Sequence, residues 1–242
     1  MKKPIELVTG FLDEISEPAS NRVRGRYEGH DVEIRFVDRG SGSTRDPFTE
    51  VWMLRAATRE DVLLHVIPQT QADVAEIAHG RGTDVVIGDR AFDDAFFVEA
   101  GPADVVLRLF DAPIREAMLA ARPIGIHSHP DGLFLEQRGW IEDAAPLRRL
   151  VALGVRIVEA LPLAVEAADR DAQSREGYRA TVSPETLAEQ RRQEVSDVAA
   201  KRNWREERRR MTGCMLTGAL LLVVMLWAVL TVRFCGDGGS FD

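Results

Sequence analysis

Apolar residues in the first seventy positions change from helical to strand spacing. Over residues 4–16 they recur every three or four positions, which predicts one helix closed by Pro18. From residue 22 onward apolar and polar residues alternate, which predicts strands. These strands are expected at 22–27, 31–37, 50–57 and 61–67. The first two are expected to form a hairpin turned by Glu28-Gly29-His30, and the last two a second strand pair.

The middle of the chain mixes helical and strand patterns. Helices are expected within 68–82 and at 102–110, 112–121 and 143–168, the last rich in Ala, Leu and Val. Strands are expected at 84–87 and 95–99, and a hairpin at 124–127 and 133–137, turned by Pro130-Asp131-Gly132. Together these elements predict an α+β domain over residues 1–168, with a mostly antiparallel sheet and packed helices.

Charge and then apolarity dominate the C-terminal part. After a linker at 169–182, Ser183 and Pro184 suit the cap and the first position of a helix, expected to continue as a charged, solvated juxtamembrane helix over 183–210. No residue between 212 and 232 is charged, and 21 residues at the helical rise extend about 31 Å, the thickness of a bilayer core. We therefore predict one transmembrane helix at 211–233 and a short exterior tail at 234–242.

The distribution of charge predicts the orientation of this helix. Six basic residues lie in 201–210, whereas only Arg233 follows the apolar run, so the N-terminal domain is expected in the cytoplasm. The N-terminus lacks the apolar run of a signal peptide. Only three of the 31 basic residues are lysine, a codon bias typical of a high-GC bacterium. The expected location is the bacterial inner membrane, crossed once.

Composition excludes several classes of function. Residues 1–200 hold 24 basic and 35 acidic residues, and this net charge of −11 repels nucleic-acid phosphates. Both cysteines, Cys214 and Cys235, follow the main domain, which therefore has neither a disulfide framework nor a cysteine-based zinc site. The chain has no phosphate-binding loop, dinucleotide fingerprint or nucleophile elbow, and no cofactor is expected.

A motif in the centre of the chain resembles a bacterial family. The motif reads Gly88-Asp89-x-x-Phe92-Asp93-x-x-Phe96-x-Val98, and is followed by Ala112-Pro113-x-x-Arg115 and by the hairpin residues Asp131-Gly132-Leu133. It is similar to a domain of unknown function found in membrane-associated bacterial proteins. The resemblance covers about residues 84–140. Because that family's function is undefined, the resemblance implies an architecture and not a chemistry.

Four carboxylates within this region allow two interpretations. They belong to Asp84, Asp89, Asp93 and Asp94. One interpretation is a divalent-cation site, although the spacing differs from that of a calcium-binding loop. The other, which we favour, is that Asp89 stabilises a turn while Phe92 and Phe96 pack into the core.

A second candidate for chemistry is the segment His127-Ser128-His129-Pro130-Asp131. It resembles the core of the zinc isopeptidases related to proteasome lid subunits, in which two histidines two positions apart bind zinc. Alternate residues of a strand share a face, so His127, His129 and Asp131 are candidate metal ligands. The serine and aspartate that follow in that family are missing at the corresponding spacing. The competing interpretation is a strand that ends in a Pro-Asp-Gly turn.

The absence of an assembled catalytic constellation favours a binding or scaffolding domain over an enzyme. Its expected partners are the lipid bilayer and an unidentified protein, and no nucleic acid. The alternative is a membrane-tethered metal-dependent hydrolase that uses His127, His129 and a nearby carboxylate. A third interpretation is a structural accessory of a larger membrane complex.

Overall fold

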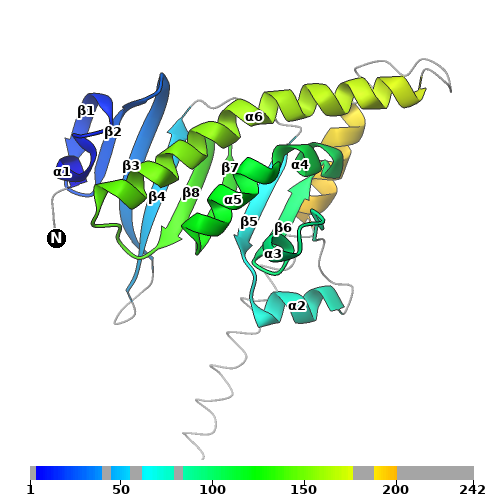
Figure 1. Ribbon diagram of the computed structural model, residues 1–242, viewed down its shortest axis with the longest axis horizontal. Coiled ribbons are helices and arrows are strands. Elements are labelled where there is room, and N and C mark those ends of the chain that lie inside the picture. The colour runs from blue at the N-terminus through cyan, green and yellow to red at the C-terminus, as the bar shows by residue number, and fades with distance from the viewer. Residues whose placement is uncertain (1–3, 40–44, 55–61, 79–83, 177–187, 201–242) are drawn as a thin grey trace, which may run out of the picture. The chain divides into compact units, whose positions relative to one another are not determined.

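A computed structural model describes residues 4–39, 45–54, 62–78, 84–176 and 188–200 (Figure 1). Its first compact unit spans Met1–Val198, and the second begins at Ala199. Nearly all of the second unit, including the predicted transmembrane helix at 211–233 and the tail at 234–242, lies outside the described residues. Within the described ranges, none of the helices combines the length and apolarity needed to cross a bilayer.

The first unit is built on one eight-stranded sheet with the order β1-β2-β3-β4-β8-β7-β5-β6, and every neighbouring pair is antiparallel. The strands are β1 (Asp13–Ala19), β2 (Arg22–Tyr27), β3 (His30–Arg39), β4 (Asp46–Leu54), β5 (Leu63–Pro68), β6 (Phe96–Gly101), β7 (Ile124–His129) and β8 (Gly132–Arg138). The predicted α+β class with a mostly antiparallel sheet is confirmed.

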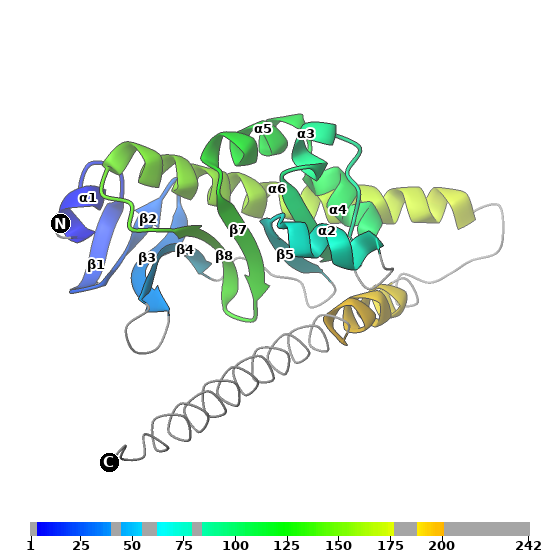
Figure 2. The same ribbon diagram turned by 90° about the horizontal axis from the view of Figure 1, so that it is seen from below.

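The described part of the chain also forms helices, some of which cover one side of the sheet. They are α1 (Pro4–Val8), α2 (Gln71–Ala78), α3 (Arg90–Asp93), α4 (Ala103–Leu109), α5 (Ala112–Ala121) and α6 (Ala144–Glu176), and 188–200 is also helical. In Figure 2, α1, α5 and α6 lie along the same side. Local sequence explains where α5 begins: the Asp111 carboxylate accepts the Ile114 amide hydrogen at 3.0 Å, and Pro113 needs no helical donor there.

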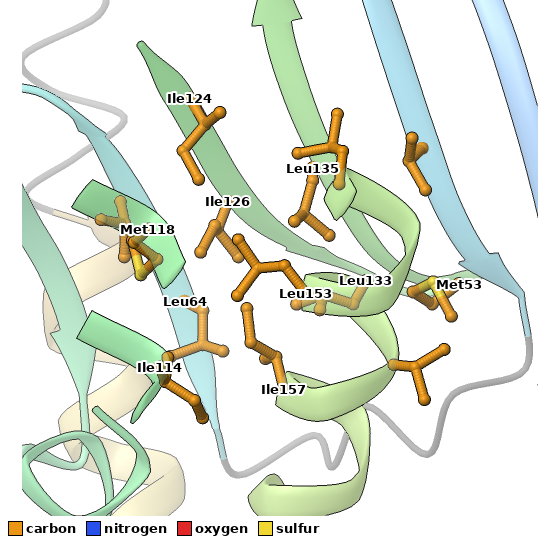
Figure 3. Close-up of a cluster of buried hydrophobic side chains, with 14 of the residues drawn as sticks. Met53, Leu64, Ile114, Met118, Ile124, Ile126, Leu133, Leu135, Leu153 and Ile157 are labelled. Carbon is orange, nitrogen blue, oxygen red and sulfur yellow. The ribbon is translucent and has the colours of Figure 1, made fainter. Parts of the chain in front are cut away.

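The core lies between these helices and the sheet (Figure 3). Leu153 and Ile157 of α6 lie against apolar residues of β7 and β8, and Met118 projects from α5 toward the same cluster. All of them are buried. Full burial of such side chains is worth about 1.5–3 kcal/mol each, so this layer holds α6 on the sheet. Gly154 permits the close approach, because a Cβ there would lie 2.9 Å from Met53 Sδ.

The single helix predicted over 4–16 is wrong. Helix α1 ends at Val8 and strand β1 begins at Asp13, after which the chain pairs with β2 from Asp13↔Arg26 to Ala19↔Arg22. Phe11 follows the helix and lies edge-to-face with Tyr27 of β2. Its apolar neighbours satisfy helical spacing, but long-range pairing with β2 determines the conformation.

The first predicted hairpin is confirmed and the second predicted strand pair is wrong. Glu28 and Gly29 connect β2 to β3 with φ of 50° and 84°, as a tight primed turn requires. Strands β4 and β5 exist, but they do not pair with each other. Strand β4 lies between β3 and β8, and β5 lies between β7 and β6. Sequence proximity favoured such a pair, whereas the sheet inserts β8 and β7 between the two strands.

The other predicted elements are found with two differences. Residues 84–87 form no strand; instead the Val85 amide donates to the Val98 carbonyl at 2.9 Å, and the Asp84 carboxylate accepts from the Val98 amide. These contacts cover the outer edge of β6. Helix α6 also continues through 169–176, where the sequence pattern predicted a linker.

Residues 188–198 are helical, as predicted, but they pack against other parts of the fold, whereas a solvated helix was expected. Arg191 is buried, and its guanidinium lies 2.5 Å from the Asp169 carboxylate of α6. The Glu194 carboxylate accepts the Ala103 amide hydrogen at the start of α4. Val198 is also buried, and its side chain would be 3.6 Å from a Cβ placed at Gly101. This segment therefore packs against the rest of the first unit.

Candidate functional site

The side of the sheet opposite the core carries an ordered network of charged and aromatic side chains. Strand alternation explains it, because each residue next to a core position points to the other face. We call this surface the polar face. It comprises Arg24, Glu33, Arg35, Arg39, Phe48, Glu50, Trp52, His65, His127, His129, Phe134 and Glu136, which cross-strand register aligns over six strands.

Glu33 is the most deeply buried charge of the polar face. Its carboxylate has no solvent exposure and pairs with the guanidinium groups of Arg24 on β2 and Arg35 on β3. Burial acts to raise the pKa of Glu33, but hydrogen bonds and charge from the two arginines outweigh it and hold that pKa below its ordinary value. Glu33 is therefore an ionised anchor that orients two arginines.

Arg39 joins two further carboxylates. Glu50 and Glu136 face each other on β4 and β8, and their like charges would repel without a cation between them. Arg39 lies 2.5 Å from Glu50 and 2.6 Å from Glu136. Burial tends to raise the pKa of Glu136, yet the neighbouring His127 and Arg39 lower it overall. This bridge favours the ionised form of Glu136 and holds both carboxylates in place.

Aromatic rings fill the space between these ion pairs. Trp52 donates its indole hydrogen to Glu50 at 2.8 Å, and its ring stacks on Phe134 with centroids 4.5 Å apart. The Arg35 guanidinium covers the Trp52 ring at 4.2 Å. His129 meets the Trp52 ring edge-to-face at 5.2 Å. The result is a rigid, amphipathic platform with guanidinium groups on its outer side.

A histidine pair ends the network at β5 and β7. The Nδ1 atoms of His65 and His127 lie 2.9 Å apart, a hydrogen-bond distance. His127 Nε2 lies 3.2 Å from Glu136, within ion-pair distance but not aligned for a hydrogen bond. A Cβ at Gly125 would be 2.8 Å from this Nε2, so glycine there leaves room for the imidazole.

The predicted metal ligands do not converge. His127 contacts His65 and Glu136, whereas His129 contacts Trp52 and lies 3.5 Å from Asp131 within its own turn. Across the residues that the structure describes, no group of three or more His, Cys, Asp or Glu side chains is arranged to hold a metal ion. The positions of His129 and Asp131 fit the interpretation of a strand that ends in a turn.

The acidic motif at 84–94 has a structural role, as the favoured interpretation predicted. The Asp89 side chain caps α3 and pairs with Arg115 of α5 at 3.0 Å. Hydrogen bonding to Arg115 and to the cap amides lowers the pKa of Asp89. Asp93 accepts the amide hydrogens of residues 87 and 88, and Phe92 and Phe96 are buried. The motif residues Asp89 and Arg115, separated in sequence, therefore meet and stabilise this corner of the fold.

Sequence reasoning did not identify most of the polar face. His65, Glu136 and Arg39 lie on three different strands and share no motif. The available signal was the alternation of charged with apolar residues in 22–27 and 31–37, which placed charge on one face. Alternation does not give the register that brings those charges together.

No family model matches the chain, and no curated protein matches it either. The similarity of residues 84–140 to a domain of unknown function therefore stays a prediction, and the function must be argued from the geometry of the polar face.

Proposed function

We propose that this chain is a binding module whose polar face docks an acidic surface of a protein partner. One observation carries the proposal: among the paired charges of the polar face, the guanidinium groups are more exposed to solvent than the carboxylates that hold them. The side chains of Arg24, Arg35 and Arg39 are 36, 32 and 43% exposed. Those of Glu33, Glu50 and Glu136 are 0, 9 and 16% exposed.

Because the carboxylates lie beneath the guanidinium groups, a docking partner would contact mainly the guanidinium groups. The buried carboxylates fix the guanidinium groups in position, so docking costs little side-chain entropy. Arg35 and Arg39 also lie over the rings of Trp52 and Phe48. Arginine and tryptophan are enriched among residues that dominate binding energy, and guanidinium groups pair well with carboxylates. The carboxylates of an acidic protein surface complement the exposed guanidinium groups of this face.

We further propose that the C-terminal segment holds this module at the bacterial inner membrane, with the N-terminus in the cytoplasm. Support comes from the sequence: the uncharged run at 212–232 and the basic cluster at 201–210. A membrane anchor restricts the module to partners at the same surface and raises their effective concentration. No observation on the described residues favours the hydrolase alternative.

Site-specific photocrosslinking in cells tests the docking proposal. A photoreactive phenylalanine analogue is placed at His129 on the polar face, in the full-length, membrane-located protein. The matched control carries the same group at Leu163 of α6, which is 65% exposed on the helical side. We expect a discrete protein adduct from position 129 and none of that size from position 163. Adducts of equal yield from both positions, or from 163 alone, would refute the polar face as the docking surface.

A further inference from the structure

The junction between β5 and β7 is the shortest pairing in the interior of the sheet. It aligns two cross-strand pairs, His65↔His127 and Val66↔Ile126, whereas β7 and β8 align six. Beyond His127 the strands are joined by a side chain: the Leu64 amide donates to the Ser128 hydroxyl at 3.0 Å. The β5–β6 strand pair is thus attached to the rest of the sheet through a junction in which side-chain contacts supplement the two aligned backbone pairs.

The histidine contact at this junction depends on protonation. Two Nδ1 atoms 2.9 Å apart form a hydrogen bond only when one carries a hydrogen and the other a lone pair. If both imidazoles are doubly protonated, two N–H groups of like charge point at each other. The hydrogen bond is then lost and repulsion replaces it.

Charged groups from neighbouring strands surround the histidine pair. Glu99 of β6 is the cross-strand neighbour of His65 on the same face, and Glu136 of β8 flanks His127. Arg39 from β3 offsets part of the Glu136 charge, and the Phe134 ring stacks on His127. An imidazolium at either position would have a carboxylate neighbour, but two imidazolium rings could not form the Nδ1–Nδ1 hydrogen bond between them.

We propose that His65 and His127 form a proton-sensitive link, which holds the β5–β6 strand pair to the rest of the sheet when the two histidines share one Nδ1 hydrogen and loosens it when a second is bound. Histidine is the side chain suited to such a change near neutral pH. The link is a property of the sheet itself and does not depend on what the polar face binds.

Hydrogen exchange of the full-length protein in detergent micelles tests the link. After correction for intrinsic exchange, we expect amides of Leu63–Pro68 and Phe96–Gly101 to exchange roughly three- to tenfold faster at pH 5 than at pH 7.5, the effect of losing one hydrogen bond. Amides of β2 and β3 serve as the internal reference. His65→Phe should remove this pH dependence, whereas His30→Gln, at the exposed pair with Glu159, should retain it. Retention of the full effect in His65→Phe would overturn the proposal.

A measurement on the unaltered protein covers the case in which the variant does not fold. With ¹⁵N-labelled histidine, we expect one protonated and one unprotonated Nδ1 in the pair at pH 7.5 and two protonated Nδ1 atoms at pH 5. An unchanged Nδ1 state across this range would overturn the proposal without any substitution.

Discussion

Glu33 shows how a single carboxylate organises the polar face. It is fully buried, and its hydrogen bonds to Arg24 and Arg35 offset the cost of removing its charge from water. Both arginines are partly exposed, so they become hydrated when the carboxylate is removed. The loss is therefore smaller than for a pair in which both partners are buried.

We predict that Glu33→Gln lowers the free energy of unfolding by about 2 kcal/mol at pH 7. A group whose folded pKa is lowered stabilises the fold above its ordinary pKa and loses that contribution as the pH falls through the folded value. The difference in stability between this variant and the parent protein should therefore shrink below about pH 4. Urea unfolding followed by tryptophan fluorescence at pH 7 and pH 3.5 measures it. Glu159→Gln, at an exposed pair, should change stability by less than about 0.5 kcal/mol; an equal loss in both variants would contradict this account.

Gly132 allows a second test at the residue scale. Its φ is 146°, and a Cβ there would lie 2.1 Å from the Met53 carbonyl oxygen of β4. Gly29 in the β2–β3 turn also has a positive φ, of 84°, but open space around it. Gly29→Ala should thus cost about 1 kcal/mol of backbone strain, and Gly132→Ala at least about 2 kcal/mol because a clash is added. Thermal unfolding ranks the two variants, and the reverse order would refute the role assigned to Gly132.

At the scale of elements, the buried guanidinium group of Arg191 helps to attach the helical segment at 188–198 to α4 and α6. The Arg191 side chain is 8% exposed and pairs with Asp169 of α6, with Asp104 of α4 at 3.9 Å. Arg192, its neighbour in sequence, is 59% exposed. Because both residues are arginines and only Arg191 is buried, comparing substitutions at the two positions tests the effect of burial at constant charge.

We predict that Arg191→Ala costs about 1–2 kcal/mol of stability and increases proteolytic cleavage near residues 188–198. Arg192→Ala should change either quantity little. Urea unfolding measures the stability, and limited proteolysis of the full-length protein with fragment mass analysis measures the cleavage. Equal cleavage in the two variants would mean that Arg191 does not hold the segment.

Local patterns predicted most elements but not how they are arranged. The Asp111-Ala112-Pro113 start of α5 and the Glu28-Gly29 turn are encoded within a few residues, and both elements were predicted. The β4–β8 and β5–β7 pairings join residues far apart in sequence, and no local signal gave them. The same reason explains the site: His127 was identified from its motif, but its actual neighbours come from other strands.

At the scale of the whole molecule, a folded module precedes a membrane segment that is inferred from sequence. We predict that the full-length protein stays with the membrane fraction after alkaline carbonate extraction. Replacing both Leu222 and Val224 by Arg places two charges at the centre of the apolar run, each costing about 2.5–3.5 kcal/mol. This variant should move largely to the soluble fraction. Release of the parent protein by carbonate would refute the anchor.

The central claim is that exposed guanidinium groups of the polar face bind an acidic protein surface. The most direct measurement is the yield of the photocrosslinked adduct from position 129 in proteins that also carry Arg35→Gln and Arg39→Gln. Near-UV circular dichroism confirms that the fold is retained, and Arg149→Gln, at an exposed position of α6, is the control. We predict that the double variant loses at least about 90% of the adduct, since each lost charged contact weakens binding by about 1.5–3 kcal/mol, while the control keeps it. An undiminished adduct from a correctly folded double variant would contradict the account.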